Sequence, residues 1–152
     1  MRRFTICTTI ALVALAGSMV MGQGAPSKIA TLGDYSAVMK SNGASNGALN
    51  KALGSGAFAD ARMQVTTIRQ NLMTLQTFWT EKKNAEVLKV VKGGLSSLDA
   101  LDKMLAAPAP DQVAAQAAAK MFGGNTCGAC HKMLREGDAQ TGFKFREGTS
   151  PF

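Results

Sequence analysis

Two long stretches of this 152-residue chain carry apolar side chains at alternating spacings of three and four residues. The first runs from Asp60 to Trp79, with apolar positions Val65, Ile68, Leu72, Leu75 and Trp79. The second runs from Asn84 to Leu105, with apolar positions Leu88, Val91, Leu95, Leu98, Leu101 and Leu105. This spacing aligns apolar side chains along one face of a helix, whereas a strand would alternate at every second residue. Both stretches are therefore predicted to be helices that bury one face, with Trp79 in the core.

Two further segments complete a helical pattern. Residues 27–53 form the first, although Gly43 and Gly47 predict a kink or a fray because an interior glycine costs about 1 kcal/mol relative to alanine. Residues 111–135 form the last, after two prolines that end the preceding helix. No long strand-like alternation occurs, and the links between helices are short. The predicted fold is therefore all-α, an antiparallel up-down four-helix bundle.

The N-terminal residues 1–22 have the pattern of a secretory signal peptide. Arg2 and Arg3 supply positive charge ahead of a largely apolar run at residues 5–20. The run is too short and too rich in threonine for a transmembrane anchor. Cys7 lies in it without a preceding lipobox and is interpreted as incidental. We therefore expect residues 1–22 to be removed, which leaves a soluble periplasmic protein with no membrane anchor.

The sequence Cys127-Gly128-Ala129-Cys130-His131 lies in the last predicted helix. Two cysteines separated by two residues and followed at once by histidine form the attachment pattern of a c-type haem. The thiols add across the porphyrin vinyl groups, and the imidazole binds the iron. On a helix, Cys127, Cys130 and His131 project from one face, because they are three and four residues apart. One covalent haem c is therefore predicted, with His131 as the proximal iron ligand.

Three other interpretations of this motif are weaker. A structural zinc site needs four protein ligands, but the mature chain has only these two cysteines and a single histidine. A thioredoxin-like dithiol would follow a strand, and no strand pattern precedes Cys127. A chance occurrence in a structural role is the third. Haem attachment is favoured because the motif uses every cysteine of the exported chain.

The position of the motif resembles that in class II cytochromes c, the family of cytochrome c prime and its low-spin relatives. The motif stands late in a four-helix chain and continues as Lys132-Met133-Leu134-Arg135. Ala37-Val38-Met39-Lys40 followed by Gly43, and Phe78-Trp79, match the family in the first two helices. The resemblance covers roughly residues 28–136. It implies a cytochrome domain at residues 23–136 with its haem near the C-terminal end of the fourth helix.

In that family a residue of the first helix covers the distal face of the haem, and the glycine spacing places Met39 there. The low-spin relatives have a ligating methionine at this position, whereas cytochrome c prime usually has a non-ligating apolar residue. The alternative for Met39 is ordinary packing, since methionine fills irregular cores well and the chain has nine. Tyr35 is a departure, because family members often have arginine one turn before the distal residue. It leaves open which group meets a haem propionate.

The C-terminal part of the chain is less regular. Arg135 is either a contact of a haem propionate or haem edge, or a solvated residue that favours the helix dipole. Residues 137–152 are rich in glycine, threonine and charge, with isolated phenylalanines at Phe143, Phe145 and Phe152. We expect them to form a flexible tail that is poorly ordered or draped over the surface.

Two functions follow from the resemblance and stay open. If His131 and Met39 both bind the iron, no coordination position is left, and the thioether stabilises ferrous iron. The protein would then be a one-electron carrier and not an enzyme. If Met39 only packs, a five-coordinate iron could bind NO or CO. A peroxidase-like enzyme is disfavoured because the mature chain has no second histidine to act on a peroxide.

The charge of the chain bears on its partners. The formal net charge is +7, and removal of Arg2 and Arg3 lowers Lys+Arg from 17 to 15 against 10 acidic residues, which leaves +5. This mild basic balance fits docking to redox proteins with an acidic surface. With one Trp and one Tyr, the chain lacks the features of a nucleic-acid binder. A homodimer through the glycine- and alanine-bearing face of the first helix stays open.

Overall fold

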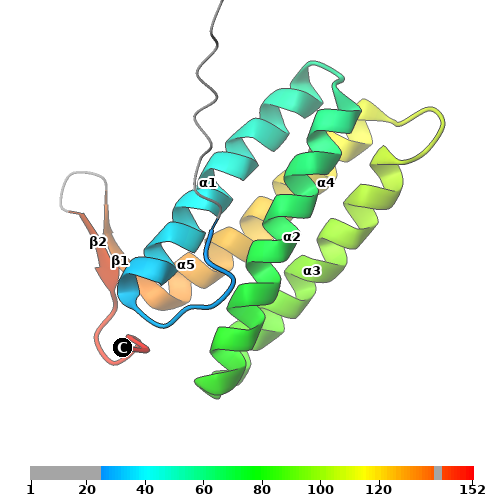
Figure 1. Ribbon diagram of the computed structural model, residues 1–152. Helices are drawn as coiled ribbons and strands as arrows, with labels where there is room; N and C mark the ends of the chain where they lie inside the picture. The colour runs from blue at the N-terminus through cyan, green and yellow to red at the C-terminus, as the bar shows by residue number, and fades with distance from the viewer. Residues whose placement is uncertain (1–24, 139–141) are drawn as a thin grey trace, which may run out of the picture.

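The computed structural model describes residues 25–138 and 142–152, so the predicted signal peptide and Cys7 lie outside the described residues. The chain is mainly helical (Figure 1). Its helices are α1 (Leu32–Gly54), α2 (Phe58–Glu81), α3 (Ala85–Leu105), α4 (Gln112–Phe122), the π-helical η1 (Gly123–Gly128) and α5 (Ala129–Leu134). Two short strands follow, β1 (Arg135–Asp138) and β2 (Gly142–Phe145). None of the described helices is long and apolar enough to cross a membrane.

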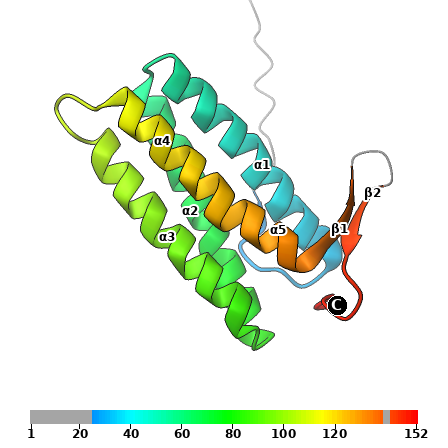
Figure 2. The same ribbon diagram turned by 180° about the vertical axis from the view of Figure 1, so that it is seen from behind.

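The helices lie side by side around one core (Figures 1 and 2). Each of α1, α2 and α3 packs against the next helix, and α4 also packs against α1. The buried apolar faces of α2 and α3 include all the predicted positions except Leu88 and Leu95, which are partly buried against the core. Trp79 is 2% exposed, as predicted. The all-α prediction is therefore confirmed, apart from the two strands at the C-terminal end.

Polar side chains cap the first turns of α1, α3 and α4. Asn84 accepts a hydrogen bond from the backbone of Val87 at 3.1 Å and caps α3 at the residue where the predicted helix begins. Asp111 caps α4 in the same way. The first helix begins at Leu32, five residues later than expected, because Thr31 caps it and forms a capping box with Asp34. Gly43 and Gly47 do not divide α1, which is continuous to Gly54.

Gly94 allows a close contact between α3 and η1. A Cβ atom at Gly94 would lie 2.5 Å from Cγ2 of Thr126 and 3.1 Å from Cδ1 of Leu72. Thr126 is itself only 3% exposed. Gly94 is therefore required by packing, since no side chain fits between α3 and Thr126, the residue before Cys127.

The neighbouring glycines predict opposite effects on stability. Gly94→Ala should lower the free energy of unfolding by about 1–3 kcal/mol, because it overpacks the contact with Thr126. Gly93→Ala should raise it by about 0.5–1 kcal/mol, because Gly93 has open space around its Cα and alanine favours helix. Denaturant unfolding of the two variants measures both values. Equal effects of the two substitutions would show that Gly94 is not sterically required.

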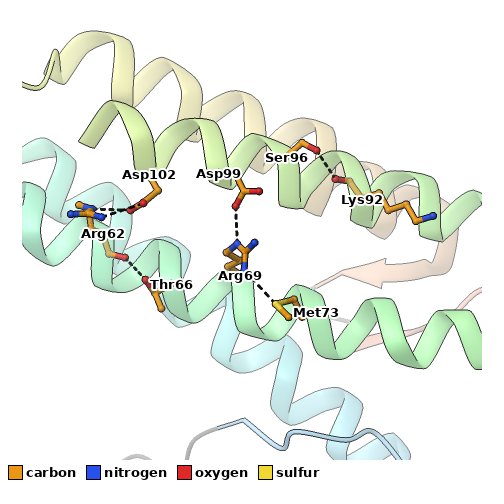
Figure 3. Close-up of polar contacts among 8 residues, drawn as sticks. All are labelled: Arg62, Thr66, Arg69, Met73, Lys92, Ser96, Asp99 and Asp102. Atoms are coloured by element: carbon orange, nitrogen blue, oxygen red, sulfur yellow. Dashed lines mark hydrogen bonds and ion pairs between the residues drawn. The ribbon is translucent and has the colours of Figure 1, made fainter. Parts of the chain in front are cut away.

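Ion pairs join the outer faces of α2 and α3 (Figure 3). Arg62 donates to both carboxylate oxygens of Asp102, through Nε at 2.8 Å and Nη2 at 3.2 Å. Arg69 donates through Nε to Asp99 at 2.7 Å. All four side chains are substantially exposed, so solvent screens both pairs and their contribution to stability is small.

The Arg62–Asp102 pair predicts a pH-dependent difference in stability. The hydrogen bond from Arg62 lowers the pKa of Asp102, so the pair stabilises the fold at neutral pH and loses this effect as pH falls through the lowered pKa. Wild type should therefore melt slightly higher than Asp102→Asn at neutral pH, and the gap should close below the usual carboxyl pKa of about 3.9. Melting curves across this range test it, with exposed Glu81→Gln as the control. A gap that widens in acid would contradict the prediction.

The C-terminal end contains a short β-hairpin that was not predicted from the sequence. The last helix ends at Leu134, and β1 and β2 pair in antiparallel register with Arg135 opposite Phe145. Lys144 and Glu136 face each other across the hairpin, with Nζ 3.1 Å from Oε1. The alternation of side chains that marks a strand was missed because each strand has only four residues. The described residues after Gly137 therefore include the strand β2, and the chain that follows β2 leads back to the end of α5.

Candidate haem-attachment site

The Cys127–His131 motif spans the junction between η1 and α5. Cys127 lies in the π-helical turn, where the backbone N–H of Ala129 bonds to the carbonyl of Gly124, five residues back. Cys130 and His131 lie in the α-helical turn that follows. The sequence predicted a regular helix throughout, so the π-helical turn was missed. Such turns are frequent at functional sites, and here it stands directly ahead of the second cysteine.

The motif side chains are half-buried at the edge of the core, and neither cysteine is in a disulfide. Burial raises the pKa of the Cys127 thiol, and burial together with the Cys127 charge raises that of Cys130 to about 11. Burial also lowers the pKa of His131, and the nearby positive charge of Arg135 lowers it further. Near neutral pH both thiols are therefore protonated and the imidazole is neutral. A neutral imidazole can bind a metal, whereas protonated thiols disfavour the dithiol-redox interpretation.

The three side chains do not converge on a single point. Within the described residues, no group of three or more His, Cys, Asp or Glu side chains could hold one metal ion. A zinc site would need such convergence. A haem would not, because the sulfurs of Cys127 and Cys130 bond to porphyrin carbon and only His131 binds iron. The residues present therefore fit a covalent haem.

Asn71 on α2 shows which part of α1 lies at the level of the motif. Its buried amide nitrogen donates to Oγ of Ser41 at 2.9 Å and to Oδ1 of Asn42 at 3.0 Å. The next residue, Leu72, lies beside the close contact between α3 and η1. Ser41 and Asn42 therefore lie at the height of Thr126, the residue before Cys127.

Tyr35 places the adjacent turn of α1 near Cys130. Burial, and then the charge of Cys130, raise the pKa of the Tyr35 phenol above its usual range. Met39 lies between Tyr35 and Ser41 on α1, and its half-buried side chain packs against the same core as both cysteines. Met39 therefore lies on the helix that the resemblance implies, in the part of α1 between Tyr35 and Ser41.

Arg135 lies outside the helix that carries the motif. It is the first residue of β1, and its guanidinium carbon is 3.7 Å from the centroid of the Phe143 ring. From the sequence, Arg135 was interpreted either as a haem contact or as a solvated residue at the helix end, and neither interpretation included this cation–π contact. It depends on the hairpin, so the isolated phenylalanine at position 143 was its only sequence signal.

A cluster of aromatic side chains next to the motif was also missed. Tyr35 contacts Phe78, Trp79, Phe145 and Phe152, with ring centroids 5.4 to 6.2 Å apart. The cluster joins α1, the end of α2 and the C-terminal residues. Tyr35 is the departure from the family pattern noted in the sequence, and its ring is the centre of this cluster.

Two surface hollows lie away from the motif. One, of about 300 Å³, lies between α1 and α2 and is lined by Ala48, Ala52, Met63 and neighbouring residues. The other, of about 250 Å³, lies beneath the segment that leads into α1, between Ile29 and Phe78. Neither is lined by Met39 or by the motif residues. The candidate site is defined by its donor chemistry and not by either of these hollows.

No protein-family model, curated protein or solved structure matches this chain.

Proposed function

We propose that this chain is an exported, periplasmic c-type cytochrome with one haem attached through Cys127 and Cys130 and with His131 as the proximal ligand. The observation that carries the proposal is the motif itself, with protonated thiols and a neutral imidazole at the edge of a helical core. The short links and the pairwise packing of the helices support the antiparallel up-down bundle that the resemblance to class II cytochromes c implies.

The proposed activity is one-electron transfer, with Met39 as the distal iron ligand. A haem in this site would supply the exchange between ferric and ferrous iron. The chain supplies an imidazole on α5 that is neutral near pH 7, a thioether on α1, and an apolar core against which Met39 and both cysteines pack. A His/Met pair of this kind favours ferrous iron and leaves no position for a substrate.

A second candidate function, the binding of NO or CO, is supported by the packing of Met39. Its side chain packs against the hydrophobic core, as an ordinary core methionine would. If this packing is its whole role, the iron is five-coordinate and the protein binds NO or CO.

The absorption spectrum of the purified, exported protein tests the proposal. A pyridine haemochrome spectrum reports whether the haem is of the c type, and the ferric spectrum reports whether the iron is low-spin. A protein exported without covalent haem would refute the proposal as a whole. A high-spin ferric spectrum would replace electron transfer with gas binding.

The proposed partners are redox proteins with acidic docking surfaces, as the net charge of +5 after removal of the signal peptide favours. The exposed Gly43 and Gly47 on α1 keep a homodimer open as a further proposal.

A further inference from the structure

The C-terminal residues are hydrogen-bonded to the end of α5, the helix that carries His131. The backbone N–H of Arg146 donates to the carbonyl of Leu134 at 2.9 Å. The hydroxyl of Thr149 lies 3.1 Å from the same carbonyl and 2.8 Å from the carbonyl of Arg146, so its single proton is shared between the two acceptors. Leu134 is the last residue of α5, so its carbonyl would otherwise lack a helical partner. Two separate donors therefore fasten the tail to α5, three residues after His131.

Two phenylalanines of the same C-terminal segment pack against α1 and α2. The Phe145 and Phe152 rings lie 5.4 and 6.1 Å from the ring of Tyr35 on α1. Phe152 also stacks on Phe78 of α2, with centroids 5.4 Å apart and an interplanar angle of 26°. The ammonium of Lys82 lies over both stacked rings, at 5.5 and 5.7 Å. Tyr35 is one helical turn before Met39.

We propose that residues 145–152 are a clamp that holds α5, with His131, against α1, with Met39, and that limits access to the Cys127–His131 motif. The role toward the haem rests on the function proposed above. The clamp is needed because the main contacts of α5 are with η1, β1 and α3. A short helix of this kind gains its connection to α1 from the tail. Phe152 is thus a positioning residue that acts through Tyr35.

The first test uses the mature chain made without haem and kept reduced. Phe152→Ala removes the ring that bridges Tyr35 and Phe78, and it should increase the rate at which a thiol reagent such as DTNB modifies Cys130 and Cys127 by several-fold. Phe152→Tyr is the matched control, because it keeps the ring and the half-exposed edge can admit a hydroxyl. It should label at the wild-type rate. Equal rates for Phe152→Ala and wild type would overturn the clamp.

A second variant guards against a general loss of folding. Thr149→Val removes the hydroxyl that is shared between the carbonyls of Leu134 and Arg146 and leaves the aromatic cluster in place, so it should increase labelling without loss of a cooperative melting transition. If Phe152→Ala does not fold, this variant decides the question. Wild-type labelling rates in Thr149→Val would then overturn the clamp.

The holoprotein provides the readout at the iron. Phe152→Ala should increase the rate of CO uptake by the ferrous protein several-fold over wild type and Phe152→Tyr, because α5 can move relative to Met39. An unchanged rate would overturn the positioning role. Failure of the proposed function looks different, since wild type would then carry no covalent haem, and the labelling experiment would still judge the clamp.

Discussion

Changing Cys127 and Cys130 together to Ala is expected to abolish the holoprotein. Without the two sulfurs no thioether can form, and only the bonds of His131 and Met39 to the iron would hold the haem. Wild-type protein denatured in acid and extracted with organic solvent should keep its haem, whereas the double variant should contain none after purification. The effect is all-or-none, because it depends on covalent bonds.

Cys7 supplies the matched control for this experiment. It lies in the predicted signal peptide, so Cys7→Ala should be exported and should carry haem like wild type. Haem that extracts freely from wild type would refute covalent attachment. Loss of haem from Cys7→Ala alone would show that the wrong cysteine had been assigned.

Replacing Met39 should convert the proposed electron carrier into a ligand-binding haem protein. Wild type is expected to be low-spin in the ferric state, with a sulfur-to-iron charge-transfer band, and to bind CO slowly because CO must displace the thioether. Met39→Ala should remove the band, lower the reduction potential and open the iron to CO. Absorption spectra, a redox titration and CO uptake measure the three effects.

Two further variants separate ligation from packing. Met39→Leu keeps an apolar side chain of similar size and removes only the sulfur, so it should reproduce the spectral change with little loss of stability. Met63→Ala is the control, because Met63 is 58% exposed on α2 and should leave the spectrum unchanged. A wild-type protein that is already high-spin and binds CO readily would show that Met39 only packs.

The parts of the fold that depend on local sequence patterns were predictable. The apolar seam of α2, the Asn84 cap of α3 and the Asp111 cap of α4 are each determined by residues within a turn or two of one another. Burial of Trp79 followed from its place in the seam. The start of α1 was misplaced because the capping box of Thr31 and Asp34 competes with the apolar residues before it.

The missed features depend on contacts between distant segments. Nothing near Gly94 in the sequence indicates that Thr126 lies against it. The cluster around Tyr35 likewise joins residues more than a hundred positions apart, and Phe145 and Phe152 had no periodic pattern to mark them as packing partners. For the candidate site, the chemistry of Cys127–His131 was evident from the motif. The surroundings of the motif required the fold.

The π-helical turn at Gly123–Gly128 also affects which way the haem motif faces. A turn of this kind holds one residue more than an α-helical turn, so it acts as a one-residue insertion in the fourth helix. Each residue of an α-helix turns the chain by about 100° around its axis. If the same residues were wound as ordinary α-helix, Cys127, Cys130 and His131 would rotate by about that angle relative to α4, so the π-helical turn absorbs the extra residue. The direction of the attachment site therefore depends on how this segment is wound as much as on the residues of the motif.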